Sequence, residues 1–151
     1  PGSASAGCSP HPSPPASATL LEAESPVIVR DSEHDIQRTL DRLKTAVGAA
    51  NMRLIRVVPF EEGIVAKGKE HPKRWLLDAC DFAFLNKALA VDPRVGLFLP
   101  CRFTVVEHNG KVQVMAVNPK RLSAIFNNAE LNDLCTQMHE TYTAIIEEAV
   151  L

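Results

Sequence analysis

The sequence predicts an α+β domain in which helices cover one face of an antiparallel sheet. Three observations carry the prediction. Short segments rich in branched apolar residues follow one another along the chain, Asn109-Gly110 is a dipeptide typical of a two-residue hairpin turn, and two segments repeat apolar residues at helical spacing. With 151 residues, 46% of them hydrophobic, the chain is long enough for one domain with a buried core. We assign this single domain to residues 27–151.

A segment of Ala, Ser and Pro precedes the domain. Residues 1–26 hold few large apolar side chains, so they cannot offset the entropy lost on ordering, and they predict a disordered leader and linker. Residues 1–3 are typical of what remains after an expression tag is cleaved. Cys8 follows Ser-Ala-Gly, which is similar to the end of a bacterial lipoprotein signal. The alternatives are a lipidated Cys8, which predicts a periplasmic or outer-membrane lipoprotein, and a chance cysteine in the leader.

The first half of the domain predicts a strand, a helix and a second strand. The segment 27–29 is β-branched and opens the first strand. Ser32 is predicted to cap a helix, with Asp35 as the partner in a capping box. Apolar residues at helical spacing extend the helix until about residue 48. Residues 52–60 are rich in branched apolar side chains and predict the second strand.

The middle of the domain predicts three strands and one short helix. A polar loop over residues 67–74 carries four basic side chains, which indicate either an anion contact or a solvated loop. Residues 75–82 predict a strand and residues 85–91 a short helix that ends before Asp-Pro. Residues 97–107 predict a long buried strand, and residues 111–117 return antiparallel after the hairpin turn.

Two helices are predicted at the end of the chain. Asn118 is a cap followed by proline, and it starts a helix to about Phe126. Asn127, with Glu130, is predicted to cap the last helix. Apolar residues over 131–149 follow the helical period closely, so this helix presents an apolar stripe to the core.

Charge and motif content narrow the function classes. The 16 basic and 18 acidic side chains give a net charge of −2, which does not favour a nucleic-acid-binding domain. No apolar run reaches the roughly 18 residues that a membrane span needs, so contact with a membrane is expected only through a lipid anchor. The sequence contains no nucleophile elbow, phosphate loop or zinc-finger spacing. We therefore find no catalytic motif and name no catalytic residue.

Two cysteines in predicted strands are candidate site residues. Cys101 follows Pro100, and proline inside a strand indicates an edge or a bulge, where a thiol can be reached. Cys80 lies in another predicted strand and would meet Cys101 if the two strands pair. Arg102 is adjacent to Cys101, but neighbouring strand residues point to opposite faces, so it is no evidence for a lowered thiol pKa. The alternatives are a metal or redox site, for which thiolates favour copper or zinc, and two buried apolar cysteines.

The last helix carries two further candidates. Cys135 lies inside the apolar stripe and is predicted to be core, because free cysteine is among the most often buried residue types. His139 flanks the stripe one turn later. It is either a ligand to something bound against the helix, for which a neutral imidazole can serve as an axial haem ligand, or a residue at the boundary of the core.

Several short segments resemble domain-of-unknown-function family 302 (DUF302) over residues 27 to 150. The segments with this resemblance are Cys80-Asp81-Phe82, Leu85 to Leu89, Asp92 to Gly96, Leu99-Pro100-Cys101-Arg102, Val105-Val106-Glu107 and Asn118-Pro119. Asp81 departs from the asparagine that part of the family has there. The positions that carry over as motif residues are Cys80, Pro100, Cys101, Arg102, Asn118 and Pro119.

The resemblance implies a small α+β domain with a layout like that of the TATA-binding protein, often homodimeric. Some relatives stand beside or are fused to c-type cytochromes and sulfur-oxidation proteins, and the family has no settled reaction. Our leading hypothesis is therefore a non-enzymatic, dimeric binding module outside the cytoplasm. It would take a small ligand or a haem-like redox cofactor, with Cys101, Arg102 and His139 as cofactor-binding candidates. The alternatives are a thiol or copper redox protein that uses Cys101 with Cys80, and a structural interaction domain.

Overall fold

The computed structural model describes residues 2, 25–60 and 73–151. The predictions for the leader, including lipidation of Cys8, and for residues 67–72 of the basic loop lie outside the described residues. Within the described residues, no helix combines the length and the apolar composition needed to cross a membrane.

Five strands form one fully antiparallel sheet, as the sequence predicts. Their order across the sheet is β1-β5-β4-β3-β2, so β4 is central and β1 and β2 are the edges. The hairpin between β4 and β5 turns at Asn109 and Gly110, which have φ of 53° and 75° and so take the left-handed conformation of a type I′ turn. The strands are β1 (Val27–Asp31), β2 (Arg53–Pro59), β3 (Arg74–Cys80), β4 (Cys101–His108) and β5 (Lys111–Val117).

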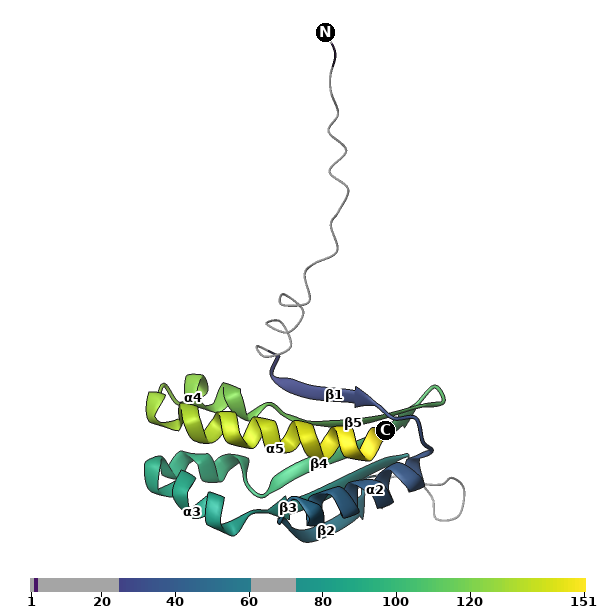
Figure 1. The fold of residues 1–151 in the computed structure, drawn as a ribbon, viewed down its shortest axis with the longest axis horizontal. Coiled ribbons are helices and arrows are strands. Elements are labelled where there is room, and N and C mark those ends of the chain that lie inside the picture. Colours follow the sequence, from purple (N-terminus) through teal and green to yellow (C-terminus); the bar gives the residue numbers. More distant parts are fainter. Residues whose placement is uncertain (1, 3–24, 61–72) are drawn as a thin grey trace.

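Two long helices lie side by side on one face of this sheet (Figure 1): α2 (Ile36–Ala49) and α5 (Asn132–Val150). The α+β prediction, with helices on one sheet face, is thereby confirmed. The main core lies between the two layers, because alternate strand residues point inward toward the apolar stripes of the helices. Its large, almost fully buried members are Leu40, Leu43, Val47, Leu77, Phe103, Val105, Val114, Ile145 and Ile146.

Shorter elements extend the domain at one end. Helix α3 (Phe82–Val91) follows β3 directly and lies at the same end of the molecule as α4 (Leu122–Ile125), as Figure 1 shows. Three 3₁₀ turns adjoin them: η1 (Pro93–Phe98), η2 (Pro119–Arg121) and η3 (Ala129–Leu131). These elements surround a second, smaller apolar cluster, separate from the main core, that contains Ala88, Val95, Leu122, Phe126, Leu131 and Cys135.

The helix caps differ from the prediction at two places. Asp35, not Ser32, caps α2, and its carboxylate accepts a hydrogen bond from the backbone N–H of Arg38 at 2.8 Å. Ser32 instead shares a hydrogen bond with Thr39. Before α5, Asn128 rather than Asn127 acts as the cap, but of the 3₁₀ turn η3. The predicted capping residues differ from the observed ones because several neighbouring Ser, Asp and Asn side chains could each serve as a cap.

Two predicted elements are shorter than expected. The strand expected over residues 97–107 begins only at Cys101, because η1 occupies residues 93–98 and a cis peptide bond joins Leu99 to Pro100. The expectation of an edge or bulge at Pro100 was wrong, since this proline precedes a central strand and so takes no hydrogen-bonding position from the ladder. The helix predicted to run from Asn118 to Phe126 is a 3₁₀ turn followed by the single turn of α4.

Candidate ligand pocket

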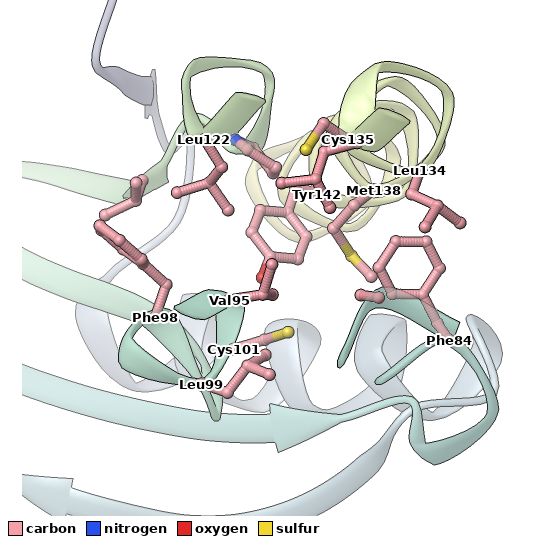
Figure 2. Close-up of a pocket in the computed structure, with 14 residues that line it drawn as sticks. Phe84, Val95, Phe98, Leu99, Cys101, Leu122, Leu134, Cys135, Met138 and Tyr142 are labelled. Atoms are coloured by element: carbon pink, nitrogen blue, oxygen red, sulfur yellow. The ribbon is translucent and has the colours of Figure 1, made fainter. Parts of the chain in front are cut away.

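An apolar pocket lies between the end of the sheet and the surrounding helices (Figure 2). Its internal volume is about 50 Å³. None of the fourteen side chains that line it is charged. They are Phe84, Ala88, Val95, Phe98, Leu99, Cys101, Val117, Pro119, Leu122, Leu131, Leu134, Cys135, Met138 and Tyr142.

Segments far apart in the sequence build the walls of this pocket. Helix α3 and η1 contribute one wall, from Phe84 to Leu99, and the elements from η2 to α5 contribute the opposite wall. Cys101, the first residue of β4, reaches the pocket from the sheet, since its register partner Ala79 and the next inward residue Phe103 belong to the same inner face. The pocket therefore depends on the tertiary fold and not on one local motif.

Tyr142 and Cys101 form the polar pair of the pocket. The Tyr142 hydroxyl and the Cys101 thiol interact with each other in the pocket, and both residues are more than nine-tenths buried, with 7% and 3% of their surface exposed. Burial raises the pKa of the Cys101 thiol to about 11 and the pKa of Tyr142 well above its ordinary value. Both groups are therefore neutral hydrogen-bond donors at physiological pH.

The pocket opens at an apolar rim. Phe98 and Val117 line it and are also 38% and 48% exposed, whereas Ala88, Leu131 and Cys101 are almost fully buried. The rim is supported from one side by an edge-to-face contact between Phe98 and Phe126, whose ring centres are 5.8 Å apart. The lining thus includes both almost fully buried residues, such as Cys101, and partly exposed ones, such as Phe98.

A buried carboxylate joins the two walls. Asp92, between α3 and η1, accepts three hydrogen bonds from the guanidinium of Arg94 and one from the side-chain amide of Asn128, which precedes η3. Arg94 also donates to the carbonyl oxygen of Phe126 at 2.8 Å and lies over its ring. This polar clip connects the α3–η1 wall with the α4–η3 wall beside the pocket.

A second buried carboxylate lies on the opposite face of the sheet. Asp78 in β3 is 1% exposed and accepts hydrogen bonds from Arg102 at 2.8 Å and from Arg56 at 2.7 Å. The hydrogen bonds from these arginines, Arg102 foremost, hold the pKa of Asp78 below its ordinary value. The Arg94 and Asn128 hydrogen bonds do the same for the pKa of Asp92.

These two carboxylates predict a loss of stability in acid. Because their pKa values are lower in the folded than in the unfolded chain, their contribution is complete above about pH 4 and disappears as the pH falls through the folded values. We expect the urea midpoint to be constant near neutrality and to decrease below pH 4. In a chain with both Asp78→Asn and Asp92→Asn the midpoint should be lower at pH 7 and should fall less in acid. An equally steep acid fall in the double variant would contradict this assignment.

The cofactor-binding candidates do not converge on one place. Cys101 lines the pocket, whereas Arg102 lies on the other sheet face with Asp78. His139 is half-buried, and its Nδ1 lies 2.9 Å from the side-chain oxygen of Asn118, which is fully buried. Asn118 also binds the carbonyl oxygen of Ser25 through its amide. The observed contacts of His139 are therefore with the segment that holds β1 in place, and it is not among the residues that line the pocket.

The metal candidates Cys80 and Cys101 lie in β3 and β4, which pair with each other. Ala79 is the register partner of Cys101, so Cys80 is one residue away from direct pairing, and both cysteines are buried free thiols. Among the described residues, no group of three or more His, Cys, Asp and Glu side chains is placed to hold a metal ion.

The state of the cysteines predicts low thiol reactivity. Burial raises the pKa of Cys80, of Cys101 and of Cys135, and the thiolate is the reactive form. We expect iodoacetamide at pH 8 to leave these three residues unmodified in the folded protein. In guanidinium at about 6 M, which denatures the chain fully, it should modify all three, as peptide mass spectrometry would show. Rapid modification of Cys101 in the folded chain would contradict the assigned protonation state.

The fold and the pocket together define a small α+β sandwich domain with a single sheet, one helical layer and a pocket at the end between them. The model of one family, described as domain of unknown function DUF302, matches residues 28–149, so the chain belongs to the DUF302 family. The chain is similar to the solved structure of an uncharacterized conserved DUF302 protein from Bacillus stearothermophilus, with a TM-score of 0.74 and 20% sequence identity. The match covers 82% of this chain and 98% of that one, and it supports the fold. A search of the curated proteins found no similar protein.

Sequence reasoning missed most of the pocket. Of the site residues that it named, only Cys101 lines the pocket, and Cys135 and Met138 were interpreted as core. Tyr142, the partner of Cys101, belonged to the predicted apolar stripe of the last helix. One signal was present: it is the only tyrosine in the chain, and a buried tyrosine hydroxyl usually finds a hydrogen-bond partner.

Proposed function

We propose that this chain is a non-enzymatic binding module that takes a small, mainly apolar ligand into the pocket between the sheet and the helices. The observation that carries the proposal is the lining itself: fourteen side chains without a charge, with one polar pair at the buried end. Apolar concave sites with a few polar groups are the usual form of small-molecule sites. The raised pKa of Cys101 supports binding over catalysis, because a protonated thiol is a poor nucleophile.

A titration with two small compounds tests the proposal. Methyl butyl ketone and its isosteric alkene, in which a methylene group replaces the carbonyl oxygen, are added separately to the full chain. We expect saturable changes in the NMR signals of the pocket methyl groups of Val95, Leu122 and Leu134, and none at Val58, which lies on β2. If neither compound changes the pocket methyl signals, the proposed function fails.

We do not extend the proposal to a haem-like cofactor or to copper. The pocket volume of about 50 Å³ is well below the range of about 300–1,000 Å³ that is usual for pockets with drug-sized ligands. Burial raises the pKa of the candidate axial ligand Cys101 to about 11, so its thiol is protonated, and the Nδ1 of His139 contacts the side-chain oxygen of Asn118. The residues present therefore do not fit a haem in this pocket. An absorption spectrum with a Soret band, or bound copper in protein purified from its native source, would reverse this assignment.

The proposal includes a homodimer formed through the open sheet face. On the face opposite α2 and α5, a group of apolar side chains is only partly covered: Val29, Leu76, Val106 and Met115. Partly exposed apolar groups on a sheet face favour association with a second copy. We expect sedimentation equilibrium to give twice the mass of one chain, and Val106→Lys to shift the chain toward the monomer. A monomer at all concentrations would remove this part of the proposal.

The proposal also places the domain outside the cytoplasm, attached through lipid at Cys8. Its support is the Ser-Ala-Gly-Cys sequence and the Pro- and Ser-rich segment that follows it. Mass spectrometry of protein from its native membrane fraction should find acyl groups on Cys8. An unmodified Cys8 in that material would leave the binding module without this anchor.

A further inference from the structure

We propose that the pocket selects an uncharged molecule with an apolar body and one hydrogen-bond acceptor, such as a ketone or ether oxygen, at the end that enters first. This inference rests on the proposed function and names the ligand class of the same site. The feature that carries it is the Tyr142 hydroxyl and the Cys101 thiol, which both line this otherwise apolar pocket and belong to residues that are more than nine-tenths buried.

The lining excludes a charged ligand. All the side chains that line the pocket are uncharged, and a charge that leaves water without a partner carries a large desolvation cost. The ion pair beside the pocket, buried Asp92 with the partly exposed Arg94, is already satisfied by mutual hydrogen bonds and by Asn128 and the carbonyl oxygen of Phe126. Neither charge is available to a ligand without dismantling the clip.

The polar pair has one more hydrogen than it uses. Tyr142 brings an O–H and Cys101 brings an S–H, since both groups are protonated. One hydrogen bond between the two groups uses one of these hydrogens, whichever group donates. The other hydrogen remains available to an acceptor, and a ligand oxygen that enters the pocket supplies one. The pair therefore binds a ligand with a hydrogen-bond acceptor more tightly than a pure hydrocarbon of the same shape.

The position of the pair fixes the orientation of the ligand. Tyr142 and Cys101 are at most 7% exposed, whereas the rim residues Phe98 and Val117 are far more exposed. In Figure 2 the Tyr142 and Cys101 side chains lie among the other lining residues, with Leu122 of α4 and Cys135 of α5 drawn above them. The acceptor oxygen thus enters first, and the hydrocarbon part extends toward Phe98.

The size of the pocket limits the part of the ligand that is enclosed. A cavity of about 50 Å³ exceeds the roughly 10–15 Å³ that one water needs and is smaller than the cavity of about 150 Å³ that binds benzene. It encloses the carbonyl end of a short chain. The remainder of the chain would lie against the exposed apolar side chains of the rim.

The test compares methyl butyl ketone with its isosteric alkene and with hexanoate, in the unaltered chain and in the Tyr142→Phe variant. We expect the ketone to bind the unaltered chain about five- to tenfold more tightly than the alkene, which is the usual value of one hydrogen bond. Tyr142→Phe should remove most of this difference, because the Cys101 S–H that stays is only a weak donor, and should leave the affinity for the alkene unchanged. Hexanoate should produce no change at the pocket. Ala90→Leu, at an exposed position of α3 outside the pocket lining, is the control and should keep the preference for the ketone.

The outcomes distinguish failure of the proposed ligand class from failure of the proposed binding function. If the alkene binds as tightly as the ketone, or if Tyr142→Phe keeps the preference, the ligand class is wrong and the pocket is still a binding site. If hexanoate binds in the pocket, the ligand class is also wrong. If neither neutral compound binds the unaltered chain, the proposed function fails and the ligand class fails with it. Melting curves of both variants show whether they are folded, and an unfolded Tyr142→Phe chain leaves the ketone-to-alkene ratio of the unaltered chain as the deciding measurement.

Discussion

Replacing Phe103 with alanine is expected to lower the free energy of unfolding by about 3–5 kcal/mol, the usual cost of removing a buried phenylalanine. Phe103 lies in the central strand β4 and is fully buried. Its ring meets the Tyr142 ring edge to face, with centres 5.2 Å apart. The substitution leaves a cavity between the sheet and α5, and urea denaturation followed by circular dichroism measures the loss.

Phe82→Ala is the matched control for Phe103→Ala. Phe82 is half exposed at the start of α3, where the Arg53 guanidinium lies 5.9 Å from its ring centre. We expect this substitution to cost less than about 1 kcal/mol, as is usual for surface positions. Similar losses in the two variants would mean that Phe103 is not the centre of the core.

Filling the pocket from α3 is expected to abolish ligand binding. Ala88 is almost fully buried and lines the pocket, and Ala88→Leu places three further carbon atoms in a space of about 50 Å³. We expect the affinity for methyl butyl ketone to fall more than about tenfold, the equivalent of at least 1.4 kcal/mol (about one factor of ten in an equilibrium constant). Leucine is a good helix former, so α3 should persist.

The control for this variant is Ala90→Leu, the same substitution at an exposed position of the same helix. It should leave ketone binding unchanged. Melting curves should show that both variants are folded, because a side chain that fills a cavity adds apolar contact. Undiminished ketone binding by Ala88→Leu would place the binding site elsewhere.

The sequence predicted the sheet and the long helices because their signals are local. The apolar stripe over residues 131–149 and the Asn109-Gly110 turn each specify a conformation within a few residues. The boundaries around Pro100 were wrong for a tertiary reason. Residues 97–99 are apolar and were assigned to the strand, but Asp92 caps residues 93–98 as a 3₁₀ turn, whose Val95 packs in the smaller apolar cluster.

The candidate site was mostly beyond sequence reasoning because no local pattern encodes it. Phe84, Leu122 and Tyr142 meet only after β3, β4 and β5 have paired and α5 has packed across them. Each of these residues has an ordinary place in a helix pattern. Cys101 became a candidate because of its neighbour Pro100. The residue with which it interacts in the pocket, Tyr142, lies 41 positions later in the sequence.

The separation of the two apolar clusters has a consequence for how the domain fluctuates. The smaller cluster, around Ala88, Leu122 and Leu131, is joined across its two walls by the Asp92 and Arg94 clip, while the main core lies beneath α2 and α5. Local opening at the pocket end can therefore occur while the layer of α2 and α5 stays packed on the sheet. Amide hydrogens of α3 and α4 should then exchange with solvent earlier than those of β4, and an occupied pocket should slow that exchange most at the two short helices.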